Sequence, residues 1–398
     1  MATFSVRFLG CKVSHADAHA IREALLRDGH SEGEGGEIAV INSCCVTHEA
    51  VRKSRHAAAR AARTHGRVYV TGCGANLGGD PFAGLPDNIT VVSRQSEETP
   101  TFVAGDVGAI GCVQADARLD RVRAFVRVQD GCSFSCNFCV IPLVRGRSRS
   151  RSAEAVLAEV RKRVEQGHRE VVLTGINLGC FRDRRAGYTL ARLVREAGAT
   201  PGLRRLRLSS IEVNHVSEEL IGALRETATV SRHLHVPLQS GDDGVLAAMG
   251  RRYTAATYLR RLAPLVDFNL TTDVIVGFPA EDERAFESTR RVLSEAGVTK
   301  AHVFPYSPRP GTATAAVDVV APEVKKRRSA RLRADSHEAC LERWRAKVGH
   351  DDEVLVDRPG RGYGDDYSPW LVDISVPVGE LVRVRARTVS EEGIVGVV

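Results

Sequence analysis

Short apolar runs alternate with amphipathic stretches along the first hundred residues. The apolar runs, which predict β-strands, cover residues 4–9, 38–42, 68–71 and 89–92. Residues 16–27 and 49–63 instead carry apolar side chains at helical spacing and predict two helices. Alternation of this kind indicates a parallel sheet covered by helices. The polar stretch over residues 93–119, with its glycines, is typical of a linker.

A second alternating block begins at residue 122. Its predicted strands are residues 122–128, 170–174, 203–209, 233–236, 272–276 and 300–304, and helical patterns between them include 153–166, 217–226 and 281–296. Six β/α units favour a β/α barrel or an incomplete one. In such folds the chemistry lies at the carboxyl ends of the strands.

Residues 325–347 predict one long helix that is rich in charge. Its nine basic residues outnumber its three acidic ones by six, which is nearly the whole net charge of +7. Two interpretations stay open at this point. The helix is either a solvated, charged surface, or it faces RNA through its first cations, Lys325, Lys326, Arg327 and Arg328.

The last fifty residues change to short strand-like runs separated by Gly, Asp and Pro. The runs are residues 353–356, 368–374, 381–387 and 393–398, a pattern typical of a small β-barrel. We therefore predict an α/β protein of three domains: a parallel α/β domain over residues 1–118, a partial β/α barrel over 119–345 and a β-barrel over 346–398.

Composition narrows the class of protein. A net charge of +7 and a pI of about 9.0 permit nucleic-acid binding without requiring it. No apolar run approaches the roughly 20 residues that a membrane helix needs, and the first residues lack the apolar core of a signal peptide. We therefore expect a cytoplasmic protein without a membrane partner. Ten cysteines in a reducing compartment favour metal binding or catalysis over disulfides.

Three of the cysteines, Cys132, Cys136 and Cys139, form a C-x3-C-x2-C loop directly after the first strand of the second block. Three thiolates on one short loop can bind three irons of a 4Fe–4S cluster, which leaves the fourth iron open to the amino and carboxylate groups of S-adenosylmethionine (SAM). A structural zinc site is the alternative, but it needs a fourth protein ligand, and none follows within the next several residues.

This loop resembles that of the radical SAM superfamily, including the aromatic Phe138 before the last cysteine, whose backbone contacts the adenine of SAM in the family. The following Ile-Pro-Leu-Val-Arg-Gly segment resembles the methylthiotransferase branch. The resemblance implies radical chemistry at Cys132, Cys136 and Cys139, with electrons from a low-potential flavodoxin or ferredoxin. Four arginines follow at alternate positions, where an extended strand would direct them alike toward RNA phosphates, unless they are a solvated connector: Arg145, Arg147, Arg149 and Arg151.

Cys11, Cys44 and Cys73 each follow one of the first three predicted strands. The carboxyl ends of parallel strands share one edge of a sheet, so these thiols can converge there. Their Leu-Gly-Cys-Lys, Asn-Ser-Cys and Thr-Gly-Cys motifs resemble those of methylthiotransferases, which implies a flavodoxin-like domain holding a second 4Fe–4S cluster that delivers sulfur. The extra thiol of Cys45 departs from the family pattern, which favours Cys44 as the ligand.

The segments around residues 208–212, 233–241 and 302–312 look most like the branch that acts on N6-threonylcarbamoyladenosine at position 37 of tRNA. Sister branches act on isopentenyladenosine or on a ribosomal protein. By the same resemblance, Gln239 and Ser240 lie near SAM or the substrate, and Val274 and Gly277 line the adenine pocket. The histidines and Gln239 can equally be core polar residues.

The C-terminal strands resemble a TRAM domain, an RNA-binding barrel, through Gly-Asp-Asp-Tyr at residues 364–367. The predicted cofactors are thus two 4Fe–4S clusters and SAM, and the predicted partner is tRNA. A hypothesis of another class is a non-catalytic iron–sulfur protein that binds RNA or senses redox state. It predicts cluster binding without SAM cleavage.

Overall fold

The computed structural model describes residues 2–33, 35–93 and 122–398 of the chain. Its internal contacts divide the chain into two compact units. The first comprises Met1–Arg118, Asp130–Arg149 and Ser307–Val317, and the second comprises Leu119–Gln129, Ser150–Tyr306 and Asp318–Val398. The C-x3-C-x2-C loop thus groups with the N-terminal unit. The expected linker lies almost entirely outside the described residues, as does Cys112.

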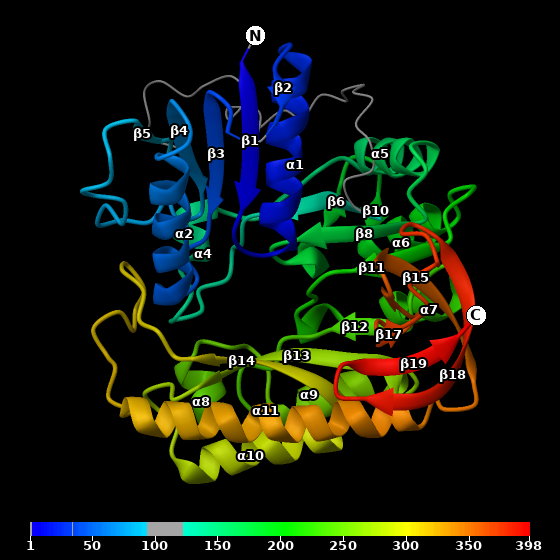
Figure 1. Cartoon of the computed structure of the whole chain (residues 1–398). Coiled ribbons are helices and arrows are strands. Elements are labelled where there is room, and N and C mark those ends of the chain that lie inside the picture. The colour runs from blue at the N-terminus through cyan, green and yellow to red at the C-terminus, as the bar shows by residue number, and fades with distance from the viewer. Residues whose placement is uncertain (1, 34, 94–121) are drawn as a thin grey trace. The chain divides into compact units, whose positions relative to one another are not determined.

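The first unit is built on a parallel sheet with the strand order β2-β1-β3-β4-β5 (Figure 1). Its elements are β1 (Thr3–Phe8), α1 (Lys12–Arg27), β2 (Ser31–Glu32), β3 (Ile38–Ser43), α2 (His48–Ala61), β4 (Arg67–Gly72), β5 (Ile89–Val91) and α4 (Ile141–Arg145). The expected parallel sheet is confirmed. The two-residue strand β2 was not expected, because two residues carry no periodicity.

Helices α1 and α2 cover opposite faces of this sheet, since side chains alternate along each strand. On one face, Phe4 packs with Ile21 and Leu25 of α1. On the other face, Ile41 packs with Ala58 of α2. Both apolar clusters are buried, so the sheet is fixed from both sides and its strand ends are held in place.

The second unit contains six main parallel strands in chain order, paired as two sheets, β11-β8-β6-β7 and β12-β13-β14. The Ile211 N–H donates to the His235 carbonyl at 3.0 Å and links the two sheets. The bounds are β6 (Arg123–Asp130), β7 (Arg149–Ser150), α5 (Ala153–Glu165), β8 (Glu170–Gly175), β9 (Arg182–Asp183), β10 (Tyr188–Thr189), α6 (Leu190–Gly198), β11 (Arg205–Leu208), α7 (Glu218–Glu226), β12 (His233–His235), α8 (Asp243–Ala248), α9 (Ala255–Leu262), β13 (Asn269–Val276), α10 (Glu283–Glu295) and β14 (Val298–Pro305). All six expected strands are confirmed.

Polar residues begin most of the helices in this unit. Each one accepts a hydrogen bond from a backbone N–H in the first helical turn, which otherwise has no partner inside the helix. These capping residues are Ser152, Thr189, Ser217, Asp242, Thr254 and Asp282. Their places in the sequence explain why the helices begin where they do.

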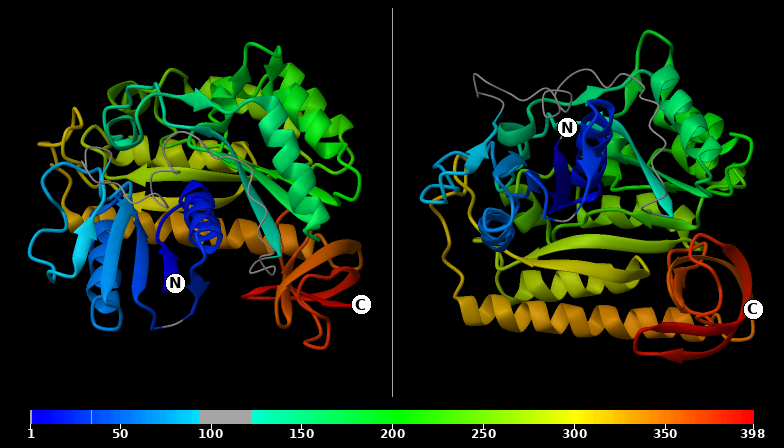
Figure 2. Two further views of the ribbon diagram at one scale, coloured as in Figure 1. Left: turned by 90° about the horizontal axis from the view of Figure 1, so that it is seen from above. Right: turned by 45° about the horizontal axis from the view of Figure 1, so that its top comes forward.

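The long helix expected over residues 325–347 is α11 (Pro322–Arg345), and it packs along β14. The C-terminal strands then close into a barrel in the order β15-β16-β17-β19-β18 (Figure 2). They are β15 (Asp351–Arg358), β16 (Arg361–Tyr363), β17 (Pro369–Leu371), β18 (Leu381–Ser390) and β19 (Gly393–Val397). The barrel is confirmed, with the three-residue β16 as an additional strand.

A buried carboxylate, Glu170 at the start of β8, is surrounded by three arginines. Arg207, Arg123 and Arg205 approach its oxygens at 2.8, 3.1 and 3.3 Å. Burial alone would raise the pKa of Glu170, but these cations hold it below its ordinary value. The group is therefore ionised and fully paired within the core.

The same arginines attach the C-terminal barrel to the β/α strands. Arg207 donates to the carbonyls of Gly364 and Asp365 at 2.8 and 2.9 Å, and Arg205 donates to the Glu353 carbonyl at 2.6 Å. The backbone carbonyls of the Gly-Asp-Asp-Tyr segment, which suggested an RNA-binding module, thus accept hydrogen bonds from an arginine of the core.

Within the described residues, no helix combines the length and the apolar character needed to span a membrane.

We predict that Glu170→Gln lowers the free energy of unfolding by about 3–5 kcal/mol at pH 7, because three buried cations lose their carboxylate. The folded pKa of Glu170 is lowered, so its contribution is complete above the unfolded pKa of about 4.3 and is lost as pH falls toward the folded value. Urea unfolding at several pH values measures both effects. Glu226→Gln, which breaks an exposed pair with Arg195, is the control and should cost at most about 1 kcal/mol. Equal losses in the two variants would contradict the role of Glu170 as a buried partner of three arginines.

Candidate functional site

Cys11, Cys44 and Cys73 follow the carboxyl ends of β1, β3 and β4, which are neighbours in the sheet. Gly10 precedes the first of them with a φ of +132°, and a Cβ there would lie 3.3 Å from the Cβ of Cys44. Gly72 precedes the third with a φ of +86°, and a Cβ there would lie 2.0 Å from the side-chain oxygen of Asn42. Only glycine allows the strand ends to approach this closely.

The thiols of this group interact electrostatically. Burial, together with the neighbouring Cys73 and Cys11, raises the pKa of the Cys44 thiol to about 11. A hydrogen bond from the Cys45 thiol, together with the charge of Arg145, lowers the pKa of Cys73 to about 6. Cys45 therefore lies against Cys73.

The guanidinium of Arg145 is buried among acceptors. Its Nε donates to the sulfur of Cys73 at 3.0 Å, while its two terminal nitrogens reach Asp17 at 2.6 Å and Asp130 at 3.1 Å. Arg145 ends the short helix α4, six residues after Cys139. The expectation that it lies on an extended strand and faces RNA is wrong, because the segment is helical there and the side chain is only 5 % exposed.

The loop that carries Cys132, Cys136 and Cys139 is held by its own backbone. The Cys132 N–H donates to the Gly146 carbonyl at 3.0 Å, and the Cys139 N–H donates to the Cys136 carbonyl at 3.0 Å. Thr314 donates to the carbonyl of Asn137 through its N–H at 3.2 Å and its hydroxyl at 3.0 Å. All three thiols are half-buried, as is Phe138.

Both sets of cysteines fit iron–sulfur chemistry better than a single metal ion. In the described part of the chain, no three His, Cys, Asp or Glu side chains are grouped around one ion-sized point. A 4Fe–4S cluster asks for something different, namely three thiolates that each bind a separate iron. Each set supplies three cysteine thiols, which are donors of the type that such clusters require.

The residues expected near SAM lie at the ends of β12 and β13 in the second unit. Gln239 forms an isolated parallel bridge with Val274, and its φ of +69° marks the end of the strand. The buried Ser240 hydroxyl accepts the Asp242 N–H at 3.2 Å. Gly277 donates its N–H to Glu281 at 2.5 Å. Gln239 and Val274 are thus brought together, and Ser240 and Gly277 have roles in the local structure.

Lys325 and Arg328 were also expected to contact RNA, and this is corrected. Lys325 is buried, paired with Asp318 and donates to the Tyr306 carbonyl at 3.2 Å. Arg328 is buried and donates to Glu281 at 2.8 Å. Both point into the protein because α11 turns that face toward the β/α strands. The neighbours that remain exposed are Lys326 and Arg327.

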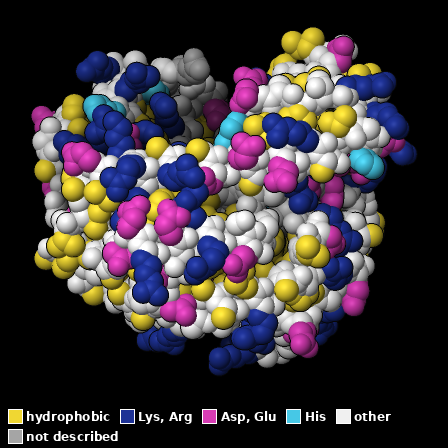
Figure 3. All heavy atoms as spheres, turned by 90° about the horizontal axis from the view of Figure 1, so that it is seen from below, with side chains coloured by type: hydrophobic (Ala, Val, Ile, Leu, Met, Phe, Trp, Pro, Cys, Tyr) yellow, Lys and Arg dark blue, Asp and Glu magenta, His cyan; other side chains and the backbone are white. Residues whose placement is uncertain are grey.

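The remaining arginines of the segment that follows Cys139 differ in burial. Arg151 is half-buried and donates to Glu159 at 2.6 Å and to the Arg127 carbonyl at 2.7 Å. Arg149 is exposed and pairs with Asp130 at 3.2 Å. Arg147 is exposed as well. Figure 3 views the face of α10 and α11, where basic and acidic side chains are intermingled, and pairs such as Arg290–Asp335 at 2.6 Å agree with a solvated, charge-balanced surface.

Comparisons with known proteins decide the family. Residues 3–93 match the uncharacterized protein family UPF0004, and residues 126–293 match the Radical SAM superfamily. The threonylcarbamoyladenosine tRNA methylthiotransferase MtaB of Bacillus subtilis is 35% identical over 97% of this chain and 94% of its own length. MtaB of Chlamydia pneumoniae is 34% identical over 99% and 97%. The chain belongs to the radical SAM methylthiotransferase family.

A sister enzyme, the tRNA-2-methylthio-N(6)-dimethylallyladenosine synthase of Erythrobacter litoralis, is 32% identical over 99% of this methylthiotransferase and 96% of its own length. Among solved structures, the radical SAM methyltransferase TsrM of Kitasatospora setae has a TM-score of 0.58 at 14% identity, covering 79% of this chain and 74% of its own. That likeness shows the shared fold alone. Family membership brings SAM and one 4Fe–4S cluster with it.

Two residues of the methylthiotransferase site were missed by sequence reasoning. Asp17 lies in the apolar stripe of α1, four residues from Val13 and from Ile21, and is 1 % exposed. A buried carboxylate in such a stripe requires a cation beside it. Asp17 was therefore the signal in the sequence that an arginine such as Arg145 is buried. Arg309 donates to the Cys45 carbonyl at 3.3 Å, and no pattern in the sequence pointed to that contact.

We predict that Arg145→Gln destabilises the protein by about 3–5 kcal/mol, because the buried Asp17 carboxylate loses its cation. Arg149→Gln is the matched control, since Arg149 also pairs with Asp130 but is exposed, and it should cost at most about 1 kcal/mol. Anaerobic thermal unfolding followed by circular dichroism measures both variants. The structural role assigned to Arg145 would be wrong if the two variants melted together.

Proposed function

We propose that this methylthiotransferase converts N6-threonylcarbamoyladenosine at position 37 of tRNA into its 2-methylthio derivative. The observation that carries the proposal is the placement of two cysteine triads in one family member, one on a loop after β6 and one on three adjacent strand ends. The substrate assignment draws on the relatives, since the MtaB enzymes match at 34% and 35% and the dimethylallyl enzyme at 32%.

The two triads would hold separate clusters. Cys132, Cys136 and Cys139 would bind the cluster that takes SAM, and Cys11, Cys44 and Cys73 the auxiliary cluster. When bound, these groups supply one-electron cleavage of SAM and a source of sulfur, as cofactors rather than side chains do in such reactions. A low-potential donor of flavodoxin or ferredoxin type would supply the electrons.

The chain's own residues would orient and tune the clusters. The Arg145 N–H next to the Cys73 sulfur places a hydrogen-bond donor and a positive charge beside an auxiliary ligand. Hydrogen bonds to the sulfurs of a cluster and a nearby positive charge both raise the reduction potential of that cluster. Because Arg145 belongs to the segment that follows Cys139, it links the two triads within one unit.

In the second unit, Gln239 and Val274 would contact SAM or the base, with Ser240 and Gly277 shaping the strand ends around them. The C-terminal barrel would act as a TRAM-type RNA-binding module, and the N-terminal sheet as a flavodoxin-like domain. Among the cations expected to meet RNA, those that remain exposed are Arg147, Arg149, Lys326 and Arg327.

The substrate is tested by nucleoside mass spectrometry of tRNA from a deletion strain. We expect the methylthio form of threonylcarbamoyladenosine to disappear and the methylthio form of isopentenyladenosine to persist. Complementation with the wild-type chain should restore the first product, while the Cys132→Ala variant should not. Loss of the isopentenyl product instead would transfer the chain to the sister branch.

The two-cluster assignment is tested by iron and product analysis after anaerobic reconstitution. Wild type should hold about eight irons, and Ala at Cys132, Cys136 and Cys139 should leave about four and abolish 5′-deoxyadenosine. Ala at Cys11, Cys44 and Cys73 should leave about four irons and SAM cleavage, but no methylthiolated tRNA.

Single variants distinguish Cys44 from Cys45 as a ligand of the auxiliary cluster. Cys44→Ser should lose auxiliary iron, and Cys45→Ser should retain it. The reverse result would make Cys45 the ligand. Methylthiolation of tRNA over several turnovers by the variant with Ala at Cys11, Cys44 and Cys73 would contradict the auxiliary cluster. If the wild type formed no 5′-deoxyadenosine, that result would favour the non-catalytic hypothesis.

A further inference from the structure

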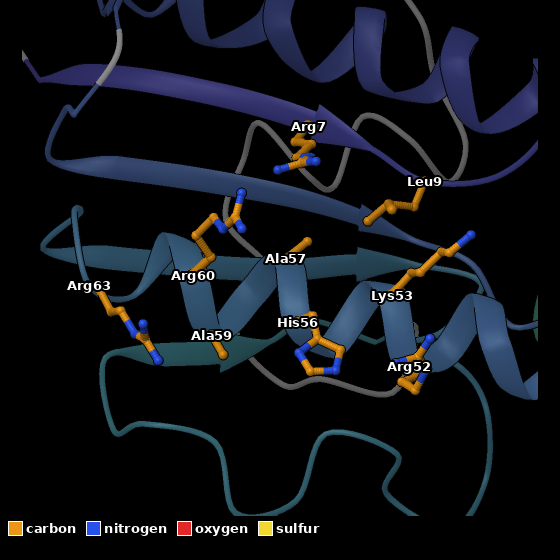
Figure 4. A pocket seen from close by; sticks show the side chains of 9 residues that line it. All are labelled: Arg7, Leu9, Arg52, Lys53, His56, Ala57, Ala59, Arg60 and Arg63. Carbon is orange, nitrogen blue, oxygen red and sulfur yellow. The ribbon is translucent and has the colours of Figure 1, made fainter.

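We propose that a basic hollow between β1 and α2 binds the phosphate backbone of the tRNA substrate. The hollow has a volume of about 450 Å³. Arg7 enters it from β1, and the other cations come from α2 and the turn that follows it (Figure 4). The six basic residues that line it are Arg7, Arg52, Lys53, His56, Arg60 and Arg63.

The charge of this surface is neutralised only in part by the described residues around it. No carboxylate is among the described residues that line the hollow. Glu49 pairs with Arg52 at 2.8 Å and with Lys53 at 3.7 Å, both near the start of α2. Farther along, within the described chain, the exposed guanidinium groups of Arg7, Arg60 and Arg63 have no acidic partner. Cations left unpaired in this way are available to an anion from outside.

The hollow differs from the comparable groove between α10 and α11, which has a volume of about 520 Å³. That groove mixes both signs of charge, and Arg290 is paired there with Glu287 at 2.7 Å and Asp335 at 2.6 Å. It therefore offers little to a polyanion. The hollow on α2 collects positive charge on one helix face instead.

The spacing of the cations indicates an extended anion. Arg52, His56 and Arg60 follow one another at intervals of four residues along α2, and Arg63 lies in the turn that follows the helix. From Arg52 to Arg60 the helix rises by eight residues at about 1.5 Å each, roughly 12 Å, which exceeds the reach of a single phosphate. Arginine forks suit phosphate oxygens in particular. Successive phosphates of an RNA strand match this arrangement.

The packed floor of the hollow also suits a contact with the phosphate backbone of RNA. Leu9, Ala57 and Ala59 line it, and Leu9 and Ala57 belong to the packed cluster between the sheet and α2. The cations thus project from a rigid base. The sequence immediately before α2 contains Cys44 and Cys45, so the proposed contact lies in the domain that carries the auxiliary cysteines.

This proposal rests on the proposed tRNA substrate. The test is the salt dependence of binding between the reconstituted enzyme and a fluorescent anticodon stem-loop transcript. In the Arg7→Gln/Arg60→Gln/Arg63→Gln variant, three lost phosphate contacts should reduce the slope of log K against log salt by about two to three. At physiological salt, Kd should rise about tenfold or more. SAM cleavage without RNA should be unchanged.

The matched control removes three exposed arginines from the second unit: Arg161→Gln/Arg184→Gln/Arg185→Gln. It should keep a slope within about one of wild type. A wild-type slope in the first variant, or equal losses in both, would overturn the proposal. Unchanged RNA binding with slower reduction by flavodoxin would also overturn it and make the hollow a donor surface. Wild type that binds the RNA but never methylthiolates tRNA would contradict the proposed function alone.

Discussion

A single buried cation, Arg145, is the constraint on which the candidate site depends. Its guanidinium bonds to the sulfur of Cys73 and to the carboxylates of Asp17 and Asp130. A buried charge is tolerated only when it is paired and hydrogen-bonded. Because the partners come from α1, from the loop after β4 and from the end of β6, satisfying this one charge fixes three segments that are distant in the sequence.

The parallel sheet explains why the cysteines can be so far apart in the chain. Neighbouring strands end at the same edge, so residues 11, 44 and 73 are brought to one place without any local motif. Glycines at positions 10 and 72 then allow that edge to be tightly packed. The cysteines of the second triad need no sheet edge, since the eight residues from Cys132 to Cys139 suffice to hold their backbone in a compact turn.

Sequence periodicity predicted most of the fold because strands and helices of ordinary length repeat their burial pattern several times. It missed β2, β9 and β10, which have two residues each, and the three-residue β16. The convergence of Cys11, Cys44 and Cys73 was predictable because each follows a strand of one parallel sheet. Arg145, Lys325 and Arg328 were misassigned because charge alone does not reveal burial. Their acidic partners come from elsewhere in the chain, and only Asp17, in the apolar stripe of α1, hinted at such a pair.

Burial of charged side chains also changes what a net charge of +7 means for RNA binding. Many of the cations are neutralised internally: Arg123, Arg205 and Arg207 surround Glu170, and Arg328 faces Glu281. Such arginines stabilise the core and cannot contribute to long-range attraction of RNA. Attraction comes from the exposed cations that the fold leaves without a carboxylate. The excess of basic residues therefore acts as two separate sets, one that joins strands to the C-terminal barrel and one that stays in solvent, and only three-dimensional structure separates them.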